Sequence, residues 1–558
     1  MFENKNFKSL GRIVSMALAM VILASNTVFA QKLTVRGTVL DSKNEPVVAA
    51  GVQEKGTSNG AVTDLDGKFS ITVSGKNAVL LFTSIGYSSI EMPVAGRTVL
   101  DVIMTEDSEM LDNVVVVGYG SQFKEAVTGA ISSVKEKDIK APNAVSADAS
   151  LQGKVAGLTI TNQSGDPNAT SSIRLRGVIS LSGGNTPLVL VDGLEGSLDT
   201  VAPEDIESID VLKDASAAAI YGTRGAAGVI IITTKNGKRE SDTRVNYSGY
   251  GSLSTFGKTL DMMDAQDIRE GKTNFQDKGY DTDWLDAVTR NAFTHNHNLM
   301  VSGGNKSTSY NADITYRDQQ GVFLNTYAND LRFNAGLSHW FLNDMLKVSF
   351  NIQKHWHKNG PVDAAGTQVY RQALMRNPTE PIKNPDGSWY ENTSINYYMN
   401  PVALLYEHTG EYKSENTRLT GNVLFEPIRG WQTSLMLSTN RFNGHDEGYY
   451  TSNHYDQFTQ YKTGYAYHSY SYSKTDNLEV TTSYKNQWGD HRFEGLLAYS
   501  YQYEYGEGFN AGNTNFMSDY YQWNNIGVGQ YLKDGKASMG SWASDSKLIG
   551  FVGRISYG

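Results

Sequence analysis

The residue types that usually carry out catalysis are missing from this sequence or stand in patterns that do not suit it. Cysteine is absent, which removes thiol nucleophiles, zinc–thiolate sites and disulfides. No GxSxG, HExxH or P-loop motif occurs. Aspartate and glutamate are numerous, yet no spacing between them pairs two carboxylates for acid–base work. We therefore expect neither an enzyme nor a cofactor.

Two histidines, His355 and His357, would share one face of a strand and could hold a metal ion. No third ligand is evident near them in the sequence. We favour the alternative that both rings belong to the polar lining of a strand face, and we expect no metal site.

Aromatic side chains gather in two segments between expected strands, at 449–467 and 509–542. Aromatic rings offer flat apolar faces to sugars, and neighbouring Asn, Asp and Gln side chains can bond hydroxyl groups. Alternatively, these segments pack against one another or against a covering protein. The candidate substrate or lid contacts are Tyr449, Tyr450, Tyr455, Tyr520, Tyr521 and Trp523.

Four consecutive valines, Val114–Val117, follow an acidic and polar stretch at 105–113. β-Branched residues after a flexible segment strongly favour a strand. Such a strand could add to the sheet of a partner protein, or it could be the first strand of the next domain.

The N-terminus predicts a secretory signal over residues 1–30. Lys5, Lys8 and Arg12 precede the apolar run 13–24, which is too short to span a bilayer comfortably. Small residues before Gln31 suit cleavage there. The net charge of -10 argues against a nucleic-acid partner, because phosphate binding needs a basic surface.

Three regions follow the signal. Residues 31–104 hold short strand-like runs separated by turns, which predicts a small β-sandwich. Residues 105–120 combine the linker with the valine run. Residues 121–237 mix helix-like and strand-like segments, with helices expected at 144–151 and 215–221 and strands at 173–176, 188–191 and 229–234.

Residues 238–558 change to long strands that alternate between an apolar and a hydrophilic face. In 492–505, for example, Phe493, Leu497 and Tyr501 share one face, whereas Arg492 and Glu494 share the other. This period of two, in strands longer than a soluble sandwich uses, is typical of a transmembrane barrel. The expected strands are 244–253, 294–303, 307–318, 328–340, 345–357, 414–427, 431–443, 474–487, 490–505 and 546–557.

The connections between these strands alternate between tight turns and long loops. Tight turns are expected at 304–306, 341–344, 428–430 and 488–489. Long loops are expected at 254–293, 358–413, 444–473 and 506–545. Outer-membrane barrels sort their loops in this way, with the short turns in the periplasm and the long loops outside.

Five motifs in fixed order resemble the SusC/RagA family of TonB-dependent outer-membrane transporters of Bacteroidota. They are LDNVVVVGYG at 111–120, LQGKVAGL at 151–158, IRLRG at 173–177, PLVLVDG at 187–193 and the segment 209–231. Residues 31–104 resemble the carboxypeptidase-regulatory-like domain that such proteins carry.

The resemblance implies a plug domain at 121–237 inside an all-β transmembrane barrel of about 22 strands. It implies an outer-membrane protein with its N-terminal domain in the periplasm. The implied activity is TonB-dependent import of a large nutrient, commonly an oligosaccharide and in some members a peptide. The implied partners are the TonB–ExbB–ExbD complex, a SusD-like surface lipoprotein that acts as a lid, and outer-membrane lipid. The implied TonB box is Asp112, Asn113, Val114, Val115, Val116 and Val117.

The sequence departs from this family in its length, because it stops at Gly558 after about ten expected strands. A ten-stranded barrel would be filled by its own side chains and could not enclose a plug. We therefore expect the N-terminal part of a larger barrel, present as a fragment or as a non-functional truncated transporter. A passive porin would have no use for residues 111–237, an outer-membrane enzyme would need a catalytic constellation, and an adhesin would predict repeats.

Overall fold

The computed structural model describes residues 33–41, 46–47, 50–57, 59–64, 66–84, 87–104, 114–117, 120–123, 131–139, 146–161, 166–169, 171–181, 184–213, 219–257, 259–360, 365–455, 463–488 and 491–558. The expected signal peptide and the linker 105–113 lie outside these residues. The chain forms two compact units, the first ending near Val115 and the second containing the rest, apart from a short exchange of residues around 116–126.

The first unit is a β-sandwich, as the sequence predicts. One sheet has the order β4-β1-β7 and the other β3-β2-β5-β6. In β4 the alternation of KFSITV buries Phe69, Ile71 and Val73. These pack in one core with Val52 and Phe82 of the other sheet. The strands are β1 Leu33–Asp41, β2 Gly51–Glu54, β3 Gly60–Val62, β4 Lys68–Val73, β5 Val79–Ser84, β6 Tyr87–Pro93 and β7 Val102–Met104.

The second unit begins with the plug domain, a mixed α/β fold. Its main sheet has the order β10-β15-β16-β13-β14, and a separate hairpin pairs β11 with β12. The strands are β10 Ile131–Lys135, β11 Leu158–Thr161, β12 Ser172–Leu175, β13 Leu188–Val191, β14 Leu194–Glu195, β15 Ile206–Leu212 and β16 Val229–Thr234. The helices are α2 Glu136–Ile139, α3 Ala147–Leu151 and the 3-10 turns η3 Leu198–Thr200, η4 Pro203–Asp205 and η5 Ala219–Gly225.

Two plug helices were expected from the sequence, at 144–151 and 215–221. The first, expected from 144, begins at Ala147, where the Ser146 side chain accepts the backbone N–H of Ala149. In the described part of the second, Ala219–Gly225 is a 3-10 helix that Gly222 interrupts with φ 60°. Only the residues from 219 onward of this second segment are described.

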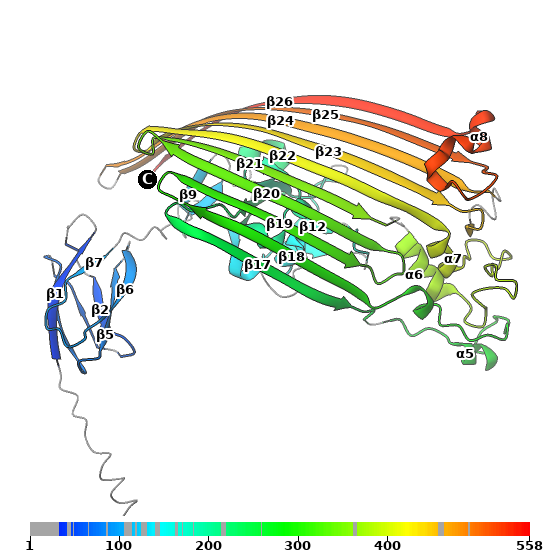
Figure 1. Cartoon of the computed structure of the whole chain (residues 1–558), viewed down its shortest axis with the longest axis horizontal. Coiled ribbons are helices and arrows are strands. Elements are labelled where there is room, and N and C mark those ends of the chain that lie inside the picture. Colours follow the sequence, from blue (N-terminus) through cyan, green and yellow to red (C-terminus); the bar gives the residue numbers. More distant parts are fainter. Residues whose placement is uncertain are drawn as a thin grey trace, which may run out of the picture. The chain divides into compact units, whose positions relative to one another are not determined.

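The rest of the second unit is one antiparallel sheet of ten strands in sequence order, as predicted (Figure 1). Its strands are β17 Ser241–Ser254, β18 Ala292–Gly304, β19 Thr308–Gln320, β20 Tyr327–Phe341, β21 Leu346–Asn359, β22 His408–Ile428, β23 Trp431–Tyr450, β24 Tyr465–Trp488, β25 His491–Thr514 and β26 Ser538–Tyr557. The loop helices are α5 Ala265–Arg269, η6 Asp286–Val288, α6 Ala365–Met375, α7 Pro401–Tyr406, η8 Gln522–Val528 and α8 Gln530–Lys533.

The last five strands extend well beyond their predicted bounds at the end that carries the long loops. β24, for example, starts at Tyr465 instead of 474, and β25 ends at Thr514 instead of 505. The expected loops 444–473 and 506–545 are therefore shorter than predicted. Apolar and polar side chains alternate only in the part of a strand that has an apolar environment on one face and a polar one on the other. The hydrogen-bonded pairing of the strands continues beyond that part.

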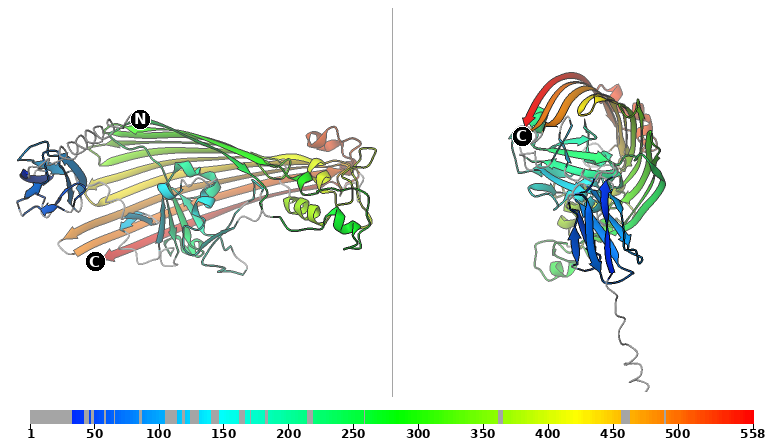
Figure 2. Two further views of the ribbon diagram at one scale, coloured as in Figure 1. Left: turned by 90° about the horizontal axis from the view of Figure 1, so that it is seen from below. Right: turned by 90° about the vertical axis from the view of Figure 1, so that its left-hand side faces the viewer.

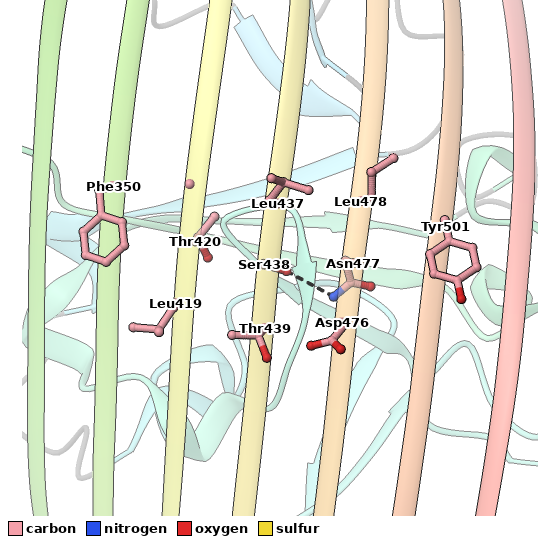
Figure 3. A pocket seen from close by; sticks show the side chains of 11 residues that line it. Phe350, Leu419, Thr420, Leu437, Ser438, Thr439, Asp476, Asn477, Leu478 and Tyr501 are labelled. Carbon is pink, nitrogen blue, oxygen red and sulfur yellow. Dashed lines mark hydrogen bonds between the residues drawn. The ribbon is translucent and has the colours of Figure 1, made fainter.

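The sheet curves around the plug, which lies against its concave face (Figure 2). On the convex face, Phe350, Leu437, Leu478 and Tyr501 stand side by side on neighbouring strands (Figure 3). Gly421 falls between Phe350 and Leu437 in this row and leaves a shallow hollow of about 460 Å³. The convex face is thus apolar, as a lipid-facing surface must be.

Among the described residues, no helix is long and apolar enough to cross a membrane.

Candidate functional site

Two arginines of the sheet reach across to the plug. Arg418 of β22 donates from Nη2 to the carbonyl oxygen of Glu195 at 2.5 Å. Arg332 of β20 donates from Nη2 to the carbonyl oxygen of Asp199 at 2.9 Å. Both arginines are buried, because the plug covers them. Because side chains alternate between the two faces of a strand, both arginines point toward the concave face.

Two asparagines of β18 make the neighbouring contacts. Asn296 donates from Nδ2 to Oε1 of Glu204 at 2.8 Å, and Asn298 donates to Oδ1 of Asp205 at 3.3 Å. Glu204 and Asp205 belong to η4, which Pro203 starts at its first position. The plug segment 195–205 therefore rests on the sheet through polar bonds along its whole length.

The concave face continues this polarity in registered rows. One row runs across five strands through Asn298, Thr315, Arg332, His355 and Asn416. The next row runs through Asn296, Arg317, Asp330, His357 and Ser414. No side chain in either row is a large hydrophobic residue. A surface of this kind can exchange plug contacts for water without exposing apolar area.

His355 and His357 share one acidic neighbour, Asp330, which could not be found from the sequence because it lies on another strand, β20. Oδ1 of Asp330 is 2.8 Å from His355 Nε2 and 2.9 Å from His357 Nδ1. However, Asp330 also binds Arg317 at 2.5 Å and Arg332 at 3.3 Å. Two guanidinium groups on one carboxylate repel a divalent cation, so the arrangement fits an ion cluster better than a metal site.

The loops around 255–291 and 365–407 fold into a small domain with a core of its own. At its centre, the buried Arg376 pairs with Glu380 at 3.1 Å and with Glu391 at 3.6 Å. The Trp284 and Tyr398 rings lie 5.2 and 4.5 Å from its guanidinium. Burial raises the pKa of Glu391 to about 7, although Arg376 opposes the shift. The loops at this end of the molecule are therefore held together by a packed core with a buried ion-pair cluster.

A cavity of about 770 Å³ lies where this loop domain meets the ends of the strands. Its lining mixes carboxylate, amide, guanidinium and aromatic groups, which can bond hydroxyls or peptide groups and stack on flat apolar faces. Sequence reasoning found only Trp523 among its residues. The lining consists of Arg290, Asp318, Gln320, Asn325, Tyr327, Asn329, Leu405, Tyr406, His408, Thr409, Gly410, Gln522 and Trp523.

The six candidate aromatic residues fall into buried packing residues and residues that are exposed or lie at the cavity. Tyr449 lies in β23 with no exposed surface, and its hydroxyl donates to Oδ1 of Asp519 at 2.7 Å. Tyr455 is buried in the core of the loop domain. Neither ring is open to a ligand, because each is a packing residue. Tyr450 stacks on His408 at 4.0 Å, beside the cavity.

The remaining three candidates lie in the loop after β25. Tyr520 is 84% exposed and Tyr521 is 48% exposed, with their rings 5.3 Å apart. Trp523 lines the cavity directly. These three side chains therefore remain available to a cargo or to a covering protein.

Val114–Val117 form strand β8, which pairs with β9, Gly120–Phe123, in a sheet of two strands. Asp112 and Asn113 lie outside the described residues. The extended conformation agrees with the prediction of a strand, and it serves equally well for pairing within the chain or with a partner.

Known families match two parts of this chain. The profile of the TonB-dependent Receptor Plug Domain matches residues 124–229, and that of the CarboxypepD_reg-like domain matches residues 35–116. Both matches fall on domains that the structure resolves separately.

Curated relatives match nearly all of it. TonB-dependent receptor SusC of Bacteroides thetaiotaomicron is 30% identical over 98% of this chain and 57% of its own length. TonB-dependent receptor P3 of Formosa agariphila is 31% identical over 99% of this chain and 55% of its own length. The chain thus spans about half the length of the curated relatives it matches.

Among solved structures, the RagAB peptide importer in the open-open state covers 80% of this chain and 54% of its own, with a TM-score of 0.67 at 24% identity. Its closed-closed state gives a TM-score of 0.65 over 77% of this chain and 53% of its own, again at 24% identity. These likenesses establish the fold. With its regulatory-like sandwich, its plug and its ten-stranded sheet, this chain belongs to the SusC-like TonB-dependent receptors of the outer membrane.

Proposed function

We propose that this chain serves the energised import of a large nutrient across the outer membrane. The observation that carries the proposal is the polar interface between plug segment 195–205 and the concave face of the sheet. A plug held by polar bonds can be drawn aside and reseated, because water replaces each lost bond. A fixed structural filling would favour apolar packing instead.

Energy would enter through Val114–Val117 acting as the TonB box together with Asp112 and Asn113. A short extended strand can add to the edge of a partner's sheet through main-chain hydrogen bonds. The strand lies directly before the plug, so a pull on it would reach the plug. In this reading β9 is a resting partner that the TonB–ExbB–ExbD complex displaces, and the N-terminal sandwich stands in the periplasm.

We favour an oligosaccharide as the cargo. The cavity at the long-loop end places Asn325, Asn329 and Gln320 beside the Trp523 and Tyr406 rings. Amides that bond hydroxyl groups and rings that stack on sugar faces suit a glycan. A SusD-like lipoprotein would close this end, and exposed side chains such as Tyr397, Met517 and Tyr520 would contact it.

A peptide is the second candidate cargo. Arg290 and Asp318 line the same cavity and would suit the charged groups of a peptide. The fold likeness to the RagAB peptide importer also favours this alternative.

Uptake of labelled cargo by cells that produce the protein tests the proposal. Fluorescent oligosaccharides and fluorescent peptides are offered in parallel, with and without an uncoupler of the inner-membrane potential. We expect oligosaccharide uptake that stops with the uncoupler. Uptake that continues in the presence of the uncoupler would indicate a passive pore. Uptake of peptides but not of oligosaccharides would make a peptide the cargo.

A further inference from the structure

Two buried carboxyl groups meet where the plug touches the sheet. Asp205 ends η4 of the plug, and Asp313 stands on the concave face of β19. They are 6% and 3% exposed, and their side chains lie within hydrogen-bonding reach of each other. A hydrogen bond between two carboxyl groups needs a proton, because two carboxylates have only acceptors.

Ordinary donors do not satisfy this pair. Asn298 reaches Oδ1 of Asp205 at 3.3 Å, a long bond, and it gives its shorter 2.8 Å bond to Thr315. The side chain of Asn334 contacts Asp313, yet Oδ1 of Asp313 receives no hydrogen bond from any described residue. A buried carboxylate with an unpaired oxygen is costly, whereas a protonated carboxyl group is neutral.

The cations nearby already have partners. Lys235 pairs with Glu136 at 2.8 Å and also donates to the carbonyl oxygen of Glu204. Arg332 uses Nη2 both for Asp330 at 3.3 Å and for the Asp199 carbonyl, while its Nε has no hydrogen-bond partner among the described residues. Lys235 and Arg332 oppose the rise in the pKa of Asp205 without cancelling it.

Three further ionisable groups lie close to the pair and do not neutralise it. His355 and Arg418 line the same small cavity as Asp205, but His355 contacts Asp330 and Arg418 donates to Glu195. The Glu204 carboxylate adds negative charge. Burial raises the pKa of Asp205, and Glu204 adds to that effect.

We propose that Asp205 and Asp313 share a single proton, and that this shared proton fastens the plug to the concave face of the sheet. Loss of the proton places two negative charges in contact inside a buried interface, which loosens the plug. The shared proton is argued from the burial of both carboxyl groups and the unpaired oxygen of Asp313, and it does not depend on the proposed function. Only the idea that loosening assists cargo passage rests on the proposed function.

Infrared spectroscopy of the purified protein in detergent tests for the proton directly. In a Glu391→Gln background, which removes the loop-domain carboxyl group with a pKa of about 7, we expect the band of a protonated carboxyl group at neutral pH, its loss at alkaline pH, and its loss at neutral pH in both Asp205→Asn and Asp313→Asn. Asp318→Asn, on the outer side of the same strand, is the matched control and should retain the band. A band that survives both substitutions, or that only Asp192→Asn removes, would overturn the proposal.

Hydrogen exchange in β15, Ile206–Leu212, tests the fastening. We expect its amides, corrected for intrinsic rates, to exchange about tenfold faster at alkaline than at neutral pH in the parent protein. In Asp313→Asn, whose amide replaces the neutral carboxyl group, this acceleration should disappear. Equal acceleration in both proteins would contradict the proposal, as would protection that depends on added calcium or sodium. Neither measurement uses cargo, so a failure of the import assay leaves this test intact.

Discussion

Arg332 shows at the scale of one residue how the plug can be held and still be released. Its guanidinium binds the Asp199 carbonyl of the plug and the Asp330 carboxylate of its own strand. A hydrogen bond contributes about 1 kcal/mol net, so the four plug contacts through Arg332, Arg418, Asn296 and Asn298 amount to roughly 4 kcal/mol. That is enough to seat the plug and little enough for a mechanical pull to overcome.

Substitutions of Trp523 and Tyr449 should have different effects, although both are aromatic residues at the long-loop end. Trp523→Ala should weaken cargo binding about fivefold, because one stacking contact is worth roughly 1 kcal/mol. Tyr449→Ala should instead destabilise the fold by about 3–5 kcal/mol, because it empties a packed site. Binding by fluorescence and unfolding by heat separate the two effects. Unchanged cargo affinity in Trp523→Ala would exclude this cavity as the binding site.

Glu391 predicts a pH dependence of the loop domain. Its folded pKa of about 7 lies above the ordinary value of 4.5, so its contribution is fully present below pH 4.5 and is lost as the pH rises to 7. The shift corresponds to about 3 kcal/mol. Hydrogen exchange in 365–406, corrected for intrinsic rates, should therefore become faster across this range in the parent protein, and much less so in Glu391→Gln. Identical profiles for the two proteins would show that Glu391 does not couple to the stability of this domain.

Several residues of the site could not be found from the sequence, and the reasons are physical. Asp330 joins His355 and His357 through strand pairing across 25 and 27 positions, which no local motif records. Tyr449 is fully buried whereas its neighbour Tyr450 is half-buried, because adjacent residues of a strand point to opposite faces. Composition identified the aromatic region but not the side of the strand.

At the scale of elements, the alternation of apolar and polar residues predicted all ten strands of the sheet, because lipid and plug impose opposite demands on its two faces. The same alternation missed the extensions of β22 to β26, which carry polar, glycine and tyrosine residues beyond the apolar stretch. Only three of the plug strands, β12, β13 and β16, were predicted from the sequence. In β16 the apolar run is continuous because Ile230 and Ile231 are buried in separate cores on the two faces of the plug sheet.

The parity of the loops predicts which end of the sheet faces outward. Arg429 lies in a tight turn and Tyr397 in the loop domain, and both are exposed. Each can be replaced by a single cysteine, because the protein has no other cysteine. In intact cells, an impermeant thiol reagent should label the cysteine at 397 and spare the one at 429. Disrupted outer membranes should allow both to react, which controls for accessibility. Labelling at 429 alone in intact cells would invert the topology.

At the scale of the whole molecule, the chain order is sandwich, valine strand, plug and sheet. The strand that we propose receives the pull therefore lies directly before the domain that we propose moves. This order was predictable because five motifs stand in a fixed order along the sequence. The interface between plug and sheet was not, because its partners lie from 92 to more than 200 positions apart.

The central claim is that energy enters through strand β8, and substitution of Val115 tests it most directly. Proline at this position removes a main-chain donor and fixes φ, so Val115→Pro should block strand addition to TonB. Val115→Ile retains the extended backbone and serves as the matched control. The measurement is uptake of labelled oligosaccharide, with the surface level of each variant determined in parallel. We predict that Val115→Pro abolishes uptake at a normal surface level while Val115→Ile retains it. Normal uptake by the proline variant at a normal surface level would contradict the account.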